Sequence, residues 1–259
     1  MPDSLRYVLV LALSVAIAWG CGNDSSSPGG NDGSGGNGGR GGTGGSPTLP
    51  KGEGLEINTG LGIAAIAEPL PGESNLHGSI FITRDEGITS DHEVSINGKA
   101  LRSVSGLATP FEGETYPDVG PGKVLRIEAH EGGDSVTIEA PCPDVAIESP
   151  ADGETIGAGE ELEITWSGDP FAGDSTLFPI LTIRVVDAQG RLETLPGTTQ
   201  VSRGQSRAEL RVPEAAVGRE AYLVFTIPGE RVAEANGVGG SHEASCVLHR
   251  RRRIEVVAP

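Results

Sequence analysis

The chain has 259 residues, which allows one or two domains of ordinary size. Its formal net charge of −17 disfavours binding to nucleic acid and to anionic lipid surfaces, and favours solubility outside the cell. Aromatic residues make up only 4%, whereas there are 40 Gly and 18 Pro, a composition that favours small β-modules over a helical bundle.

The first 20 residues are typical of an export signal. One basic residue, Arg6, precedes an apolar run at 8–19, which has the length of a signal core and is too short to span a membrane. The run ends in AWGC at 18–21, which resembles the lipobox of bacterial lipoproteins. The resemblance implies that residues 1–20 are removed and that Cys21 carries acyl chains on its sulfur and its new amine. Several chains anchor a protein durably in a membrane.

Two positions depart from the lipobox pattern, with Ala18 where Leu is usual and Trp19 where a small residue is usual. The small residues Ala18 and Gly20 also fit ordinary secretory cleavage, which would leave Cys21 as a free thiol. A cysteine between an apolar run and a polar tether favours lipidation, and Gly22 resembles the outer-membrane sorting pattern. We therefore expect a lipid-anchored protein at the outer membrane or cell surface, facing the periplasm or the exterior.

Residues 21–50 predict a disordered linker that begins at the lipidated Cys21. The stretch 22–50 contains 12 glycines and almost no apolar side chains, so it cannot offset the entropy of becoming ordered. A Gly-rich coil of this length spans roughly 30 Å. No strand precedes its glycines and no helix follows them, which excludes a phosphate-binding loop. The composition resembles the tethers of myxobacterial lipoproteins.

Residues 51–143 predict a first β-module, because short apolar runs alternate with turn residues. Asn97-Gly98 and Gly132-Gly133 predict two-residue hairpin turns. Tyr116, just ahead of a strand, resembles the corner of a β-sandwich in which a Tyr hydroxyl bonds to the backbone. The expected strands lie within Leu55–Ala67, Gly78–Arg84, His92–Ile96, Ala100–Val104, Lys123–His130 and Ser135–Ala140.

Residues 144–259 predict a second module. Its start, 145–169, resembles bacterial Ig-like and fibronectin-type repeats through Pro150, Gly153, Gly159, Ile164 and Trp166. Within ELEITW at 161–166, Leu, Ile and Trp share one face, which predicts a half-buried strand. Later strands are expected within Leu177–Val186, Arg191–Leu195, Arg207–Val212, Ala221–Ile227 and Ala244–Val257. The predicted fold class is all-β, with two tandem antiparallel Ig-like β-sandwiches after the tether.

Cys142 and Cys246 are an even pair once Cys21 is lipidated. In Ig-like sandwiches part of the first strand runs parallel to the last, so the resemblance implies that these two cysteines lie at the same end of the second module. We expect a disulfide between them, since an exported protein folds in an oxidising compartment. The alternative is two inert thiols.

No pattern in the chain indicates catalysis or metal binding. The five histidines lack zinc-ligand spacing, no nucleophile-elbow motif occurs, and the acidic loops lack calcium-loop spacing. Asp91-His92-Glu93 reads as a solvated loop, and adjacent Ser241 and His242 seldom act as a nucleophile and its base. We therefore expect no catalytic residue, no metal and no cofactor.

The run Arg250, Arg251, Arg252 and Arg253 follows His249 within the last expected strand of an acidic protein. Strand alternation divides the four arginines between two faces. One interpretation is an edge strand that charge protects against further pairing. A second is an anion-docking patch for phosphate or sulfate groups of envelope polysaccharide. A third is pairing with the chain's own acidic residues.

These patterns together predict an envelope lipoprotein, held to the membrane by its lipid anchor, whose non-catalytic ectodomain serves binding, adhesion or spacing. The expected partners are an envelope glycan or protein, and no nucleic acid. The alternatives are an accessory subunit of an envelope assembly or a secreted hydrolase. A hydrolase would require convergent titratable groups in a pocket, which no motif indicates.

Overall fold

The computed structural model describes residues 55–84, 87–88, 92–171, 177–235 and 241–259. The predicted signal segment, Cys21 and the linker lie outside these residues. All described residues belong to one compact unit, and within them no helix is long and apolar enough to cross a membrane. The secondary structure is β-strand except for one short 3₁₀-helix, so the predicted all-β fold of antiparallel sheets is confirmed.

The strands before residue 143 form two groups in the sequence, short ones followed by a long hairpin. They are β1 (Glu56–Asn58), β2 (Ile63–Ile66), β3 (Leu76–His77), β4 (Ile80–Arg84), β5 (Gly87–Ile88), β6 (Glu93–Ile96), β7 (Lys99–Ala100), β8 (Arg102–Val104), β9 (Leu107–Thr109), β10 (Val124–Glu131) and β11 (Asp134–Pro141).

After residue 143 the two longest strands come last. They are β12 (Ala146–Ser149), β13 (Glu154–Gly157), β14 (Glu161–Ser167), β15 (Ile180–Val186), β16 (Leu192–Gln200), β17 (Arg207–Arg211), β18 (Ala221–Ala235) and β19 (Ser241–Val257), with the 3₁₀-helix at Glu214–Ala216.

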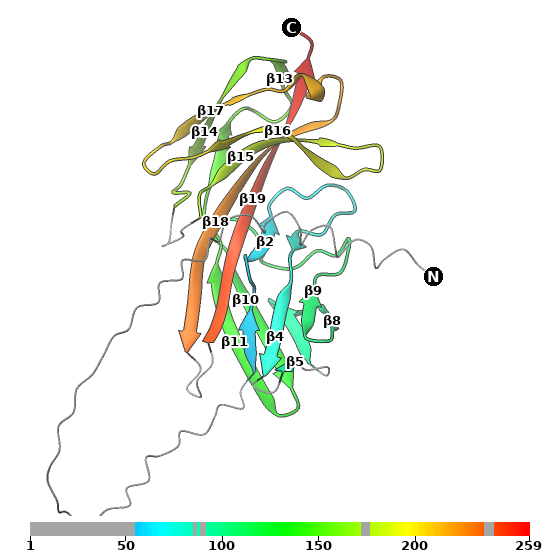
Figure 1. The fold of residues 1–259 in the computed structure, drawn as a ribbon, viewed down its shortest axis with the longest axis vertical. Helices are drawn as coiled ribbons and strands as arrows, with labels where there is room; N and C mark the ends of the chain where they lie inside the picture. Colours follow the sequence, from blue (N-terminus) through cyan, green and yellow to red (C-terminus); the bar gives the residue numbers. More distant parts are fainter. Residues whose placement is uncertain (1–54, 85–86, 89–91, 172–176, 236–240) are drawn as a thin grey trace, which may run out of the picture. The chain divides into compact units, whose positions relative to one another are not determined.

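The hairpin of β18 and β19 lies in the interior of the largest sheet, whose strand order is β16-β15-β18-β19-β1-β4-β9-β8. Figure 1 shows these two strands side by side as the longest arrows. At about 3.3 Å per residue, the 17 residues of β19 extend over roughly 56 Å. On its second flank β19 pairs in parallel with β1, then β2, and finally β13. The parallel pairing of β13 with the last strand is the one that the Ig-like resemblance implied.

Two smaller sheets face this large one, with the orders β11-β10-β6-β7 and β12-β14-β17. Both predicted hairpin turns are present: Asn97 and Gly98 join β6 to β7 with φ of 50° and 76°, and the Gly132-Gly133 turn joins β10 to β11. A two-residue turn that matches the twist of its strands needs positive φ, which Asn and Gly adopt readily.

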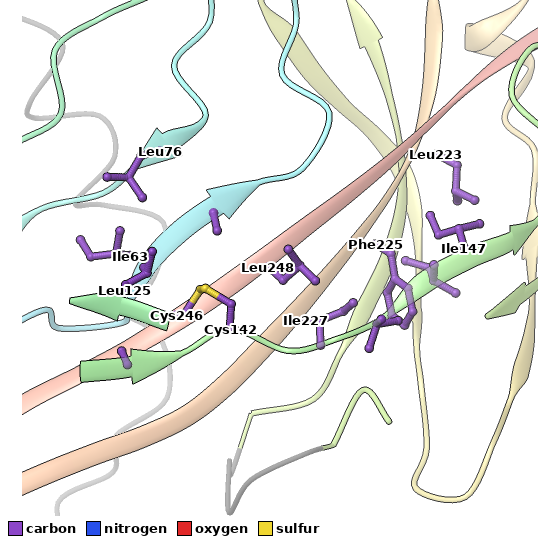
Figure 2. Packing of buried hydrophobic residues seen from close by; sticks show 14 of the residues in the cluster. Ile63, Leu76, Leu125, Cys142, Ile147, Leu223, Phe225, Ile227, Cys246 and Leu248 are labelled. Atoms are coloured by element: carbon purple, nitrogen blue, oxygen red, sulfur yellow. A yellow bond between two sulfur atoms is a disulfide. The ribbon is translucent and has the colours of Figure 1, made fainter. Parts of the chain in front are cut away.

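The core is apolar from one end of the hairpin to the other. Leu162, Ile164 and Trp166 of β14 are buried, as the alternation predicted, and the Trp166 ring lies 5.1 Å from the ring of Phe225. Figure 2 shows Phe225, Ile227 and Leu248 among the buried side chains that line the hairpin. Strands from both sides of residue 143 pair with β19, and the division into modules 51–143 and 144–259 stays a prediction.

Candidate functional site

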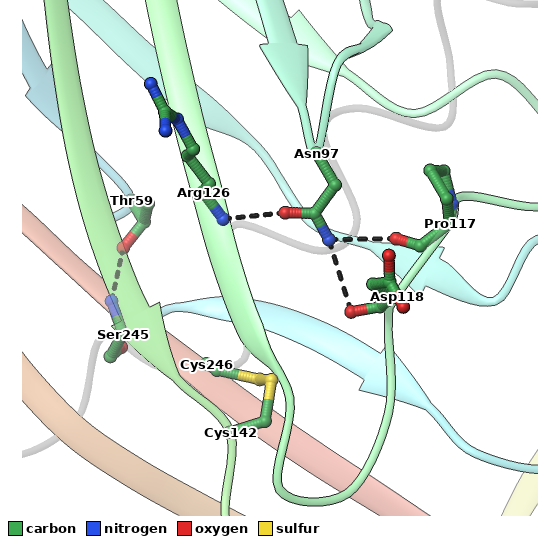
Figure 3. Close-up of a disulfide and its surroundings, with 8 residues drawn as sticks. All are labelled: Thr59, Asn97, Pro117, Asp118, Arg126, Cys142, Ser245 and Cys246. Carbon is green, nitrogen blue, oxygen red and sulfur yellow. Dashed lines mark hydrogen bonds between the residues drawn. A yellow bond between two sulfur atoms is a disulfide. The ribbon is translucent and has the colours of Figure 1, made fainter.

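A disulfide joins Cys142, which directly follows β11, to Cys246 in β19. The two sulfur atoms are 2.02 Å apart and the Cα atoms 4.9 Å apart, and both residues are buried. Cys246 also pairs with Ile63 of β2. The predicted bridge is therefore present, and it ties the end of the β10–β11 hairpin to the strand that supports the whole sheet (Figure 3). A stable disulfide indicates an extracytoplasmic compartment.

Asn97 connects three segments near this bridge. Its Nδ2 donates to the carbonyls of Pro117 at 2.8 Å and Asp118 at 3.2 Å, and its Oδ1 accepts the N–H of Arg126 at 2.8 Å (Figure 3). The side chain that allows the positive-φ turn thus also attaches that turn to β10 and to the loop before it.

The predicted tyrosine corner is confirmed. Tyr116 is buried, its hydroxyl accepts the N–H of Phe111 at 3.0 Å and donates to the carbonyl of Ala100 at 3.4 Å. Asn75 holds the backbone of Tyr116, because its Oδ1 accepts the Tyr116 N–H at 2.7 Å and its Nδ2 donates to the Tyr116 carbonyl at 2.9 Å. These four bonds fix the loop that leads into β10.

The arginine run lies inside the sheet, so the edge-strand interpretation is wrong. β18 covers one flank of β19, and β2 and β13 cover parts of the other. Between the last pair with β2 and the first pair with β13, carboxylates take the place of a neighbouring strand. The N–H of Arg251 donates to Glu68 Oε2 at 3.0 Å, and the N–H of Arg253 donates to Asp152 Oδ1 at 3.0 Å.

Three of the four guanidinium groups bond within the chain. Arg250 lies 3.0 Å from Glu68 Oε1, and Arg252 donates to the carbonyl of Ile147 at 2.7 Å. Arg251, only 4% exposed, donates through both terminal nitrogens to the two carboxylate oxygens of Glu73, one at 2.9 Å. Pairing with the chain's own acids therefore holds for Arg250 and Arg251.

The alternation predicted for the run is confirmed. Arg250 and Arg252 are opposite the apolar Phe225 and Leu223 of β18, whereas Arg251 is on the other face. Anion docking by Arg250–Arg253 stays a prediction, and Arg253 is the one exposed residue of the four.

Three titratable side chains, His77, Arg184 and His249, surround the ion pair of Arg251 and Glu73, and we call these five residues the junction cluster. Burial, together with the nearby charges of Arg184 and Arg251, lowers the pKa of His249 to about 4. Burial likewise lowers the pKa of His77, although Glu73, 3.7 Å away, opposes this. Both histidines are therefore neutral at pH 7.

The carboxyl and guanidinium groups of the cluster respond to the same neighbours. Burial alone would raise the pKa of Glu73, but the hydrogen bond from Arg251 and the bond from the Leu70 N–H bring it below the ordinary value. The pKa of Arg184 is lowered by burial and by the charge of Arg251. The cluster thus holds one tightly paired cation, Arg251, and one cation without a bonded carboxylate among the described residues, Arg184.

Two other histidines, His92 and His242, are buried. His92 is 6% exposed, so the solvated-loop interpretation is wrong for it, and Asp91 lies outside the described residues. His242 is also buried and its Nδ1 accepts the N–H of Ile57 at 3.3 Å, a structural role between β19 and β1. The bond of His242 was not detectable from sequence spacing, because its partner lies 185 residues away in the chain.

Among the described residues, no group of three or more His, Cys, Asp or Glu is placed to hold a metal ion. In the described part of the chain, one open groove lies at Glu163 with residues 204–209, and another lies between residues 217–220 and residues 253–258 at the end of β19. Neither of these two grooves is lined by His or Cys.

No family model and no curated protein matches the chain. Among solved structures it is similar to the fibronectin(III)-like modules of Clostridium thermocellum CbhA, at 12% identity over 79% of this chain and 94% of that one, with a TM-score of 0.23. It is also similar to the I-band fragment I67–I69 from titin (13% identity, 78% and 65% covered, TM-score 0.22) and to chicken CNTN1 domains FN1–FN3 (11%, 75% and 64%, TM-score 0.20). The chain spans about two thirds of the last two structures. These similarities assign no activity and no partner.

Proposed function

We propose that this protein is a membrane-anchored envelope lipoprotein whose β-sandwich ectodomain serves binding, adhesion or spacing without catalysis. The observation that carries the proposal is the β18–β19 hairpin, which pairs with strands from both sides of residue 143. One continuous pair of strands therefore supports the whole described unit. Such a unit suits a spacer domain or a domain that presents binding surfaces, because both functions require a rigid shape.

Two further features support a stiff ectodomain. The disulfide fixes Cys142 to the middle of the hairpin, and the charged residues at 250–253 close the interval between β2 and β13. An interval between two strand groups is where a hinge would bend, because no ladder hydrogen bonds cross it. Here Glu68 and Asp152 supply those bonds.

The entry point of the chain supports a role in spacing. β1 runs parallel to β19 and pairs with its beginning, at Asn58 and Glu243, whereas the C-terminus follows the opposite end of β19. If the predicted tether is lipidated at Cys21, the strands β12 to β17 are the part farthest along the hairpin from the anchored end.

Labelled palmitate tests the anchor. In the native bacterium or a lipoprotein-processing host, the full chain should incorporate label, and Cys21→Ala should not. The matched control is Cys142→Ser with Cys246→Ser, which removes the other two cysteines and should keep the label. Equal labelling of wild type and Cys21→Ala, or no label in either, contradicts the anchor.

Spin labels test the stiffness. Labels at Thr137→Cys in β11 and Glu209→Cys in β17, both exposed, report the distance between the two strand groups. A single narrow distance distribution in the full chain supports the spacer. A broad distribution means that the groups move relative to one another and contradicts it.

A further inference from the structure

One face of the β15–β18–β19 sheet gathers polar side chains over two adjacent rows. Thr182 pairs with Val224, which pairs with Arg251. In the next row Arg184 pairs with Tyr222, which pairs with Arg253. Residues directly opposite each other share a face, and so do residues two apart on one strand. Thr182, Arg184 and Arg251 therefore all project from the same face.

Three buried donors on this face have no acceptor among the described residues. They are the hydroxyl of Thr182, Nε of Arg184 and Nε of Arg251. Thr182 is 7% exposed and Arg251 4% exposed, so bulk water does not reach them freely. Native proteins pair nearly all such groups, and an unpaired set on one face indicates an acceptor from outside the chain.

The charge of the face indicates what kind of acceptor is missing. Glu73 is the carboxylate of the junction cluster, and Arg251 and the Leu70 N–H already bond to its two oxygens. Arg184 has no ion pair within the described residues, and both histidines of the junction cluster are neutral at pH 7. Water would satisfy the donors but would leave the charge of Arg184 uncompensated, whereas an anion would do both.

We propose that this face binds an oxyanion, a phosphate or sulfate group, with Arg184 as its principal ligand and Thr182 and Arg251 as further donors. The planar guanidinium group matches the geometry of such oxygens. This inference rests on the proposed binding function, for which it names the chemistry of the ligand. It does not depend on the lipid anchor, because the site needs none. The group could be a free ion or belong to an acidic envelope polysaccharide.

The test is titration of the purified full chain with inorganic phosphate and with sulfate at constant ionic strength, with chloride as the reference, followed by calorimetry and by thermal unfolding. Wild type should bind either ion saturably and unfold at a higher temperature when loaded. Arg184→Gln should weaken binding roughly 10- to 100-fold, the effect of losing a hydrogen-bonded charge. Absence of saturable binding in wild type overturns the proposal.

Two variants separate this site from general charge and from folding defects. Arg191→Gln removes an exposed arginine of the same β15–β16 hairpin and should bind phosphate like wild type. Thr182→Val should weaken binding several-fold without lowering stability, because its hydroxyl has no partner in the protein. Equal weakening by Arg184→Gln and Arg191→Gln, or unchanged binding by both Arg184→Gln and Thr182→Val, overturns the site.

Competition identifies the source of the group. If sulfated dextran displaces phosphate from wild type and neutral dextran does not, the bound group belongs to a polysaccharide. No displacement, with phosphate binding intact, assigns it to the free ion. Loss of phosphate binding would leave palmitate labelling unchanged, so this inference and the lipid anchor fail separately.

Discussion

Glu73→Gln tests whether the arginine run is a structural connection. The side chains of Arg251 and Glu73 are 3% and 19% exposed, and the substitution removes the only carboxylate that pairs with this buried guanidinium group in the described residues. Removing one partner of a buried pair costs about 3 to 5 kcal/mol. Because Gln keeps one acceptor and Glu73 is partly exposed, we expect the lower end, about 3 kcal/mol.

Urea unfolding of the full chain measures this effect as a lower midpoint with an unchanged slope, by ~1.5 M for a slope of ~2 kcal/mol per M. The matched control is Glu114→Gln, which breaks the exposed pair with Lys99, whose side chains are 33% and 52% exposed, and should cost about 1 kcal/mol or less. Replacing both Glu73 by Leu and Arg251 by Met should recover most of the loss, because neither member of this buried pair is left without the other. A Glu73→Gln shift no larger than that of the control refutes the reasoning.

The remaining predictions concern the disulfide, one histidine and one hydroxyl. Cys142→Ser with Cys246→Ser opens a loop with a sequence separation of 104 and should cost about 4.7 kcal/mol in the chain-entropy treatment, so an unchanged urea midpoint would contradict it. Burial, together with the nearby arginine charges, lowers the pKa of His249 from 6.5 to about 4. As the pH falls, the unfolded chain therefore binds a proton at this residue before the folded chain does. The free energy of unfolding should fall between pH 6.5 and pH 4 by up to about 3 kcal/mol. His249→Gln should lose less stability than wild type between pH 7.5 and pH 5, and parallel losses would exclude this origin. Tyr116→Phe leaves a backbone N–H without its acceptor and should cost about 1 to 2 kcal/mol by the same measurement, against little for Tyr222→Phe at a partly exposed site.

Local features of the fold were predictable from the sequence, because their causes lie within a few residues. Asn97-Gly98 turns because those two residue types tolerate positive φ, and the alternation of Leu162, Ile164 and Trp166 follows from the geometry of a single strand. Tyr116 bonds to a backbone group five residues away, so its motif is also local. The disulfide was predictable as a pair from cysteine number and compartment.

The environment of the arginine run was not predictable in this way. Arg251 pairs with Glu73, 178 residues earlier, and Glu68 accepts its N–H from 183 residues away. A run of four charged residues in a strand favours a solvated edge when only the strand itself is considered. His92 was misread for the same reason, since burial depends on which remote strands cover a side chain.

The position of the charges along β19 explains why they lie inside a protein otherwise cored by aliphatic residues. The parallel partner of β19 changes from β2, which ends opposite His249, to β13, which begins opposite Ile254. No strand pairs with this flank of β19 between those two positions in the described residues. The N–H groups of residues 251 and 253 would face this interval without acceptors, which is costly for the buried Arg251. Short acidic side chains from the two flanking loops reach them, and the acids in turn need cations nearby. Arginine at this place meets the second need, because Arg250 pairs with Glu68, and an aliphatic residue at 250 would leave that carboxylate unpaired.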